Sequence, residues 1–296
     1  MKLFDFDLRD WRSRHRKLYA FLRNPLSIIG LIIAITFLII AGISPFITPY
    51  PEDLTGAVHT AIRLQPPGPD HLFGTDHMGR DIFSRVIGGT RVSLQISLII
   101  IIVATLIGVP LGLIAGYIGS WIEELIMRLT DIFLAVPGIV LAIAIVASLG
   151  PGIANSMLAL SIVWWPGYVR LVHGRSKAIS ENTYVEASRA IGAGRTRIIF
   201  THILPNTASP IIVKMSMDVG MAILTAASLG FIGIGAQPPT PEWGAMISEG
   251  RGYLPTWWWS AVFPGLAIWF TVLGFNLVGD GLRDALAPRS VRQIYQ

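Results

Sequence analysis

Long runs without a charged residue dominate this sequence. Three of them cover residues 26–47, 92–122 and 132–169, which are 22, 31 and 38 residues long. A helix needs about 20 apolar residues to cross the hydrocarbon core of a bilayer, so each run can span a membrane. Charged residues make up only 14% of the chain, against about 25% in a typical soluble domain. An integral membrane protein is therefore predicted, and a disordered chain is excluded.

The third run is too long for one helix. At about 1.5 Å per residue it would extend roughly 57 Å, and Gly150-Pro151-Gly152 near its middle favours a turn. We therefore divide it into two spans and add two more apolar segments nearer the C-terminus. The result is an all-α, polytopic fold with six transmembrane helices, at about 26–47, 92–122, 132–149, 153–171, 208–231 and 258–279.

Basic residues predict the orientation of these spans. If the N-terminal tail is cytoplasmic, seventeen Lys and Arg residues lie on the cytoplasmic side and five lie outside, while Lys214 lies within a span. The positive-inside rule favours this arrangement and puts both termini in the cytoplasm. The chain then divides into a cytoplasmic tail (1–25), a first helix with an external segment (26–91), a core (92–287) and a second tail (288–296).

Residues 9–24 mix Arg and Lys with large apolar side chains. This pattern is typical of an amphipathic helix in the membrane interface, although a basic topology signal without defined structure is the alternative. The external segment 49–91 contains His71 and His77 near Asp76 and Asp81. A metal site is conceivable there, but neither spacing is a recognised ligand pattern, so an ordered polar loop packed on the helix ends is favoured.

The cytoplasmic loop 173–207 carries the clearest local signals. Thr183 and Glu186 are spaced as a capping box that starts a short helix, and Gly192 can supply its left-handed end. A second short helix over about 195–203 is expected to stop before Pro205. Crossing a membrane does not require such a helix, so it predicts a contact surface for another protein. The alternative is a solvated hairpin between two spans.

Two charges lie inside the fifth span. Lys214 and Asp218 are four residues apart and share a helix face, and a charge at membrane depth is a functional candidate. The hypothesis is that Asp218 lines a translocation path and meets the ammonium group of a substrate. A structural pair is the alternative. Met221, Trp164 and Trp165 are further candidates for this path, with simple packing as the alternative.

The loop residues also resemble a known family. Glu186-Ala187-Ser188, Gly192 and His202-Ile203-Leu204-Pro205 are similar to the "EAA" loop of ABC-importer permeases. That pattern reads Glu-Ala-Ala, three residues, Gly, nine residues and Ile-x-Leu-Pro. Ser188 here replaces the second Ala and His202 replaces the usual Ile, but the spacing is intact.

A second resemblance narrows the family. Gly74-Thr75-Asp76 with Gly79-Arg80-Asp81, together with segments 235–244 and 275–284, looks like the second (C-type) permease subunit of dipeptide, oligopeptide and nickel importers. It covers residues 20–288 and is close to the dipeptide permeases of bacteria. It implies a type I ABC-importer transmembrane domain in the bacterial inner membrane.

The resemblance also implies partners. A second homologous permease subunit would complete the path, two ATPase subunits would bind ATP and magnesium, and an extracytoplasmic binding protein would deliver the substrate. Loop 173–207 would contain the coupling helix. Membrane lipid would surround the chain, and no cofactor, metal or nucleic acid is expected in it.

The sequence also argues against other functions for this chain. No Gly-x-x-x-x-Gly-Lys-Ser/Thr motif occurs, so ATP hydrolysis is not expected in this chain. Dipeptides or short oligopeptides are the favoured solutes, with nickel or another small solute as the alternative. A secondary transporter should show inverted repeats, and none is evident. An intramembrane enzyme would need a nucleophile–base or metal constellation, which the sequence lacks.

Overall fold

The computed structural model describes residues 16–286, and within them it forms helices and no named strand. The α-helices are α2 (Arg16–Arg23), α3 (Pro25–Ile47), α4 (Ile82–Ile118), α5 (Ser120–Ala135), α6 (Gly138–Leu149), α7 (Ile153–Ser180), α8 (Thr183–Ala190), α9 (Arg195–Ile198), α10 (Leu204–Ile232), α11 (Trp243–Gly250) and α12 (Trp259–Leu286). Short turns η1 (Pro51–Leu54), η2 (Thr60–Ile62) and η4 (Arg251–Tyr253) are 3₁₀, and η3 (Ile199–Ile203) is a π-helix. The all-α prediction is confirmed.

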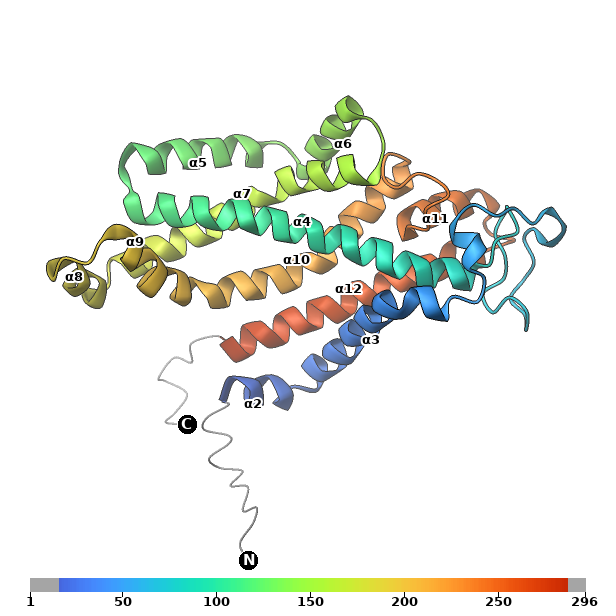
Figure 1. The fold of residues 1–296 in the computed structure, drawn as a ribbon, viewed down its shortest axis with the longest axis horizontal. Helices are drawn as coiled ribbons and strands as arrows, with labels where there is room; N and C mark the ends of the chain where they lie inside the picture. The colour runs from blue at the N-terminus through green and yellow to red at the C-terminus, as the bar shows by residue number, and fades with distance from the viewer. Residues whose placement is uncertain (1–15, 287–296) are drawn as a thin grey trace, which may run out of the picture.

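The long helices run side by side along the longest axis of the molecule (Figure 1). Four segments are long and apolar enough to cross a membrane: α3, α4, the continuous stretch from α9 through α10, and α12. The bent pair α5 and α6 makes a fifth only if it is one broken span and not a re-entrant loop. Helix α7 has 28 residues, about 42 Å at helical rise, but it is not among the segments that pass on length and hydropathy. The sixth span therefore stays a prediction.

Several expected span boundaries are wrong. Residues 132–149 are not one helix, because α5 ends at Ala135, α6 begins at Gly138, and the two helices meet at 88°. Pro137 causes the break, since it disfavours helical backbone at Val136, which is extended with φ −94° and ψ 133°. Helix α4 also begins ten residues before the expected start at 92, and it ends at Ile118 where Gly119 takes φ +69°.

A row of glycines sets the close contact between α4 and α7. Gly108, Gly112 and Gly116 are spaced four apart, so they lie on one face of α4. A Cβ atom on Gly112 would lie 2.7 Å from Cβ of Val172, and one on Gly116 would lie 2.6 Å from the carbonyl oxygen of His173. Small residues allow membrane helices to approach this closely. The contact positions the face of α7 that points towards α10.

Helices α10 and α12 pack antiparallel in a defined register. A Cβ atom on Gly279 would overlap the side chain of Met217, and one on Gly220 would lie 3.3 Å from Oδ1 of Asn276. The two contacts share one register, because moving three residues forward on α10 corresponds to three residues backward on α12. The depth of a residue on α12 along the bundle can therefore be matched to the depth of a residue on α10.

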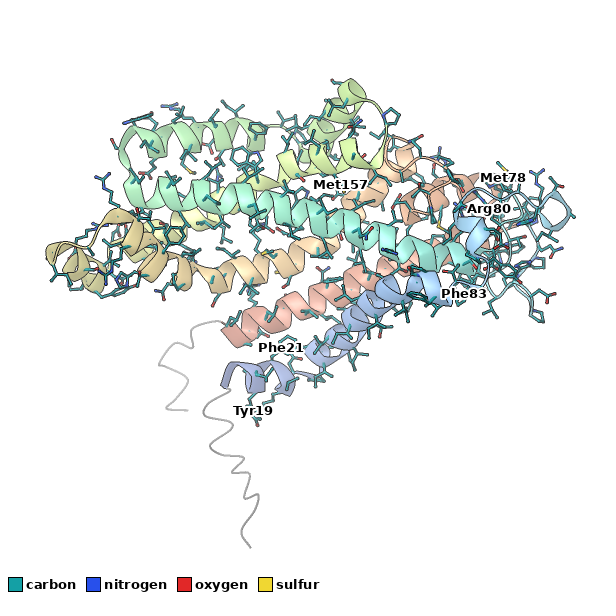
Figure 2. All side chains as sticks on the ribbon, in the orientation of Figure 1. Tyr19, Phe21, Met78, Arg80, Phe83 and Met157 are labelled. Carbon is teal, nitrogen blue, oxygen red and sulfur yellow. The ribbon has the colours of Figure 1, made fainter. Side chains whose placement is uncertain are left out.

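Helix α2 precedes the first long apolar helix. Figure 2 shows Tyr19 and Phe21 on it; Phe21 is buried, whereas Leu18 and Leu22 are exposed. Asn24 then caps α3, since its Oδ1 accepts the N–H of Leu26 at 3.0 Å. The helix expected over 9–24 is thus present from residue 16 onward, while residues 9–15 lie outside the described part. Its place in the membrane interface remains a prediction.

Candidate functional site

The loop between α7 and α10 is anchored to the bundle by apolar side chains. Val185 on α8, Ile198 at the end of α9 and Ile203 in η3 are fully buried. They pack in one cluster with side chains from three long helices, namely Leu113 of α4, Val172 of α7 and Ile211 of α10. The loop and the three long helices therefore share one apolar cluster.

The start of α8 differs from the expected capping box. Thr183 is the first helical residue, and Asn182 is the N-cap, without a side-chain bond to the helix. The Asn182 amide instead donates to the carbonyls of Ala178 and Ile179 at 3.3 and 3.1 Å, which closes the end of α7. The reciprocal bonds expected between Thr183 and Glu186 are thus not formed. Gly192 does take the expected left-handed conformation, with φ +86°.

The helix expected to stop before Pro205 continues instead. Residues 195–232 form one continuous helical stretch, through α9 and η3 into α10. Pro205 lies in the first turn of α10, and the preceding turn is the π-helix Ile199–Ile203. The wider turn takes up one extra residue and accommodates a proline that has no N–H to donate. This loop is therefore rigidly continuous with α10.

The outward face of the loop carries the residues that sequence assigned to coupling. Glu186 and Ala187 are exposed and Ser188 is half-buried. His202 packs edge-on against Tyr184 at 5.8 Å, which ties η3 to α8. Leu204 is half-buried against the apolar cluster, and Pro205 is exposed.

Two apolar side chains of the same loop point into solvent. Ile191 is 87% exposed, and Phe200 is 64% exposed. Exposed apolar side chains that form one contiguous patch mark a protein interface, whereas single ones are common on protein surfaces. Neither residue was expected from the sequence, although an Ile directly before the Gly192 stop is the available signal.

An open cavity of about 1290 Å³ lies between α7, α10 and α12. Its lining residues come from the C-terminal part of α7, from Asn182 and Tyr184 at the start of α8, from residues 206–221 of α10 and from the C-terminal part of α12. It therefore lies at the α8 end of the bundle (Figure 1). The polar and sulfur-containing residues that line it include Arg175, Asn206, Lys214, Met217, Asp218, Met221, Asn276, Asp280 and Arg283.

Lys214 and Asp218 form an ion pair on the wall of this cavity. The Nζ atom lies 3.0 Å from Oδ2 of Asp218, and it also lies 5.1 Å from the ring centroid of Tyr168 on α7. Asp218 is only 9% exposed. Met221, one turn further on, is exposed and lines the same cavity. Three of the expected path residues are therefore brought together.

Trp164 and Trp165 do not line the cavity. Trp165 is buried and packs against Phe133 of α5 at 5.3 Å, and Trp164 is half-buried on the same core. The packing alternative fits their positions. The residues expected for the path did not include Arg175, Asn206, Asn276, Asp280 and Arg283. A signal was available on α12, where the last three recur at helical spacing within an otherwise apolar segment.

The external motif residues build a network of ion pairs at the other end of the bundle (Figure 2). Arg80 contacts Asp76 from Nε to Oδ2 at 2.7 Å and Glu249 from Nη2 to Oε2 at 2.7 Å. Arg85 approaches the same two carboxylates at 3.7 and 3.4 Å. Arg80, Arg85 and Asp76 are buried, so the network clamps the 48–81 segment onto α4 and α11.

Other residues of the motif also hold the 48–81 segment against the helices. Asp81 caps α4 by accepting the N–H of Ser84 at 2.7 Å, and His71 lies 3.0 Å from its other oxygen. The carbonyl of Thr75 accepts the indole N–H of Trp259 at 3.2 Å. The expected ordered polar loop is thus present, and these contacts give its residues structural roles.

Gly74 and Gly79 take the positive φ angles +74° and +82°. A Cβ on Gly79 would overlap the carbonyl oxygen of His59, and one on Gly74 would lie 2.5 Å from the carbonyl oxygen of Gln65. Both positions therefore need glycine, for conformation and for space.

Glu242 caps α11 from a buried position. Its carboxylate accepts the N–H groups of Gly244 and Ala245, each at 2.9 Å. Burial raises the pKa of Glu242 above its usual value, and the two backbone hydrogen bonds offset part of this increase.

Asp76, His77 and Glu249 place three potential ligand atoms within 4.8 Å of one another. A divalent cation does not fit there, because the guanidinium groups of Arg80 and Arg85 already face the two carboxylates. The arrangement is an ion-pair network and gives no support for a metal centre.

The chain matches known families over most of its length. Residues 108–292 match the binding-protein-dependent transport system inner membrane component, and residues 15–67 match the N-terminal TM domain of oligopeptide transport permease C. The dipeptide transport system permease protein DppC of Alkalihalophilus pseudofirmus is 47% identical over 94% of this chain and 90% of that protein.

Other relatives have different named solutes. The probable D,D-dipeptide transport system permease protein DdpC of Escherichia coli is 44% identical, over 90% of this chain and 89% of that protein. The glutathione transport system permease protein GsiD of Salmonella typhimurium is 45% identical, over 94% and 90%. The MetNI methionine ABC transporter in inward-facing conformations matches with a TM-score of 0.56 and 19% identity, over 69% of this chain and 97% of that chain. This last likeness concerns the fold alone.

Proposed function

This chain belongs to the binding-protein-dependent transport system inner membrane components, and we propose that it is a permease subunit of an ATP-driven importer for dipeptides or short oligopeptides. The observation that carries the proposal is the cavity between α7, α10 and α12, which opens beside the anchored loop at α8. A pathway for a solute and a surface for a motor protein are thus built into one end of the bundle.

Helix α8 is the coupling helix in this proposal. Two ATPase subunits bind ATP and magnesium, and each permease subunit of a heterodimer presents one such helix to them. Ile191 and Phe200 provide apolar anchors for an ATPase groove, with Glu186 at the rim. Because Val185, Ile198 and Ile203 are buried against α4, α7 and α10, closure of the ATPases moves these helices together.

The cavity is the part of the translocation path that this chain supplies. Lys214, Asp218 and Met221 line it about halfway along α10. The ion pair offers polar contacts to a passing peptide, and the flexible thioether of Met221 adapts to side chains of different shape. No histidine is among the lining residues of this cavity, whereas imidazole is a preferred ligand of nickel. Peptides are therefore favoured over the metal.

The orientation follows from the positive-inside rule. The basic loop with α8 and both termini lie in the cytoplasm, so the cavity opens inward. The clamped 48–81 segment and α11 then face the periplasmic side, where a binding protein delivers the peptide. These placements complete a multi-pass subunit of the bacterial inner membrane.

Reconstitution tests the proposal. The complete complex, with its partner permease, ATPases and binding protein, is inserted into proteoliposomes and supplied with a labelled dipeptide. We expect uptake that requires ATP and the binding protein. Uptake driven by an ion gradient without ATP, or absence of any ATPase from the purified complex, contradicts the proposal.

A further inference from the structure

The ion pair on α10 leaves Asp218 without free charge for a solute. Its carboxylate is buried and lies 3.0 Å from the ammonium of Lys214. A peptide ammonium at this point would compete with a positive charge that is already in place. The carboxylate that meets the solute must therefore be sought elsewhere in the cavity.

Asp280 of α12 is the other carboxylate among the cavity-lining residues. It is exposed, and within residues 16–286 it forms no ion pair. Arg283, one turn further along α12, and Arg175 on α7 also line the cavity and also lack an ion-pair partner in that part of the chain. The cavity thus presents one free negative and two free positive side chains.

The register between α10 and α12 relates the depth of Asp280 to that of residues on α10. Since Gly279 packs on Met217 and Gly220 lies beside Asn276, Asp280 lies level with about Ser216. It is therefore at nearly the same depth as Lys214 and Asp218. Gly281, the next residue of α12, lies against Ser27 and Phe21, so Asp280 lies near the start of α3, where the cavity can admit a charged solute.

We propose that Asp280 binds the free ammonium group of the transported peptide and that Arg283, with Arg175 across the cavity, binds its carboxylate. The proposal rests on the proposed function, because it names the residues of that path that recognise a zwitterion. Three residues of α12 rise about 4.5 Å, and an extended dipeptide is roughly 7 Å long. The flexible arginine side chain covers the difference, so one helix can hold both charged ends.

Uptake of labelled dialanine by proteoliposomes that contain the complete complex tests this assignment. Asp280→Asn should lower the dipeptide transported per ATP hydrolysed about tenfold, because a charge-assisted bond is lost. Asp280→Glu keeps the charge and should retain most transport. The matched control is Asp284→Asn, since Asp284 is exposed on the same helix but outside the cavity lining.

The absence of cysteine from the chain allows a second measurement. In a cysteine-free complex that carries Asp280→Cys, an anionic thiosulfonate reagent should restore transport and a cationic one should not. For Arg283→Cys, the cationic reagent should restore transport and the anionic one should not. These opposite responses distinguish a charge requirement from a simple loss of packing.

The outcomes separate the two proposals. If the unmodified complex shows no ATP-driven uptake, the proposed function fails and the assignment fails with it. If uptake is normal and Asp280→Asn behaves like Asp284→Asn, only the assignment is overturned. Loss of co-purifying subunits in Asp280→Asn, but not in Asp284→Asn, also overturns it, because Asp280 then contacts the partner permease and not the peptide.

Discussion

The ammonium of Lys214 lies 3.0 Å from the carboxylate of Asp218, one helical turn further along α10, on the wall of a cavity about 1290 Å³ in volume. The ring of Tyr168 lies 5.1 Å from the same ammonium. The two opposite charges are thereby paired within the chain.

Removing one charge of this pair should impair transport more than removing both. Asp218→Asn leaves an unpaired Lys214 cation beside the path, where it repels a peptide ammonium. We expect dipeptide uptake to fall about tenfold, in line with roughly 1–3 kcal/mol for an unsatisfied buried group, with assembly intact. The double variant Lys214→Met/Asp218→Asn removes both charges and should recover part of the uptake. Equal uptake by Asp218→Asn and the unmodified complex contradicts this role.

Ile191 should be a main anchor of the ATPase contact. Ile191→Glu puts a charge where we expect an apolar pocket, and loss of an interface anchor costs about 2 kcal/mol or more. The variant should co-purify with less ATPase and should hydrolyse ATP without transport. Val58→Glu is the control, because Val58 is also an exposed aliphatic residue but lies in the external segment. Unchanged ATPase content with Ile191→Glu rules out the anchor.

The close approach of α4 and α7 should tolerate no side chain at Gly112. A methyl group there would lie 2.8 Å from the carbonyl oxygen of Val169, and overpacking of this kind costs about 1–3 kcal/mol. Gly112→Ala should therefore lower the unfolding temperature of the purified chain. Gly174→Ala is the control, since its new methyl group meets no atom within 4 Å, and it should be neutral or stabilising. A similar unfolding temperature for both variants contradicts the predicted crowding.

The external clamp should depend on arginine and not on a metal ion. Arg80→Met leaves Asp76 and Glu249 with one fewer cation, and breaking a buried pair costs several kcal/mol. We expect faster proteolysis within the 48–81 segment and a lower unfolding temperature. Treatment of the unmodified protein with a chelator should change neither quantity. A chelator effect comparable to that of Arg80→Met instead favours a metal at Asp76, His77 and Glu249.

Local sequence was enough to predict the class of the protein and several of its details. Membrane insertion depends on runs of apolar residues, and such runs are visible without knowledge of any contact. The helical stop at Gly192 was predictable for the same reason, because a left-handed residue is a property of one position. The family resemblance was carried by short motifs whose spacing is likewise local.

Other features depend on residues far apart in the chain. Whether Pro205 ends a helix or sits in a continuous one was decided by the π-turn before it and by the burial of Ile203. Thr183 does not cap α8 because it is the first helical residue, with Asn182 in the N-cap position and its amide bound to the end of α7. Sequence predicted that Lys214 and Asp218 share a face and left a structural pair open as the alternative; the 3.0 Å contact shows that they pair.

The cavity illustrates the difference most clearly. Hydrophobicity along α10 and α12 predicts that both helices enter the membrane, but it does not determine their depth relative to each other. That depth comes from the contact of Gly279 with Met217, which brings Asp280 level with the middle of α10. The face of a helix that becomes buried, and its depth, depend on packing against segments that are distant in the sequence.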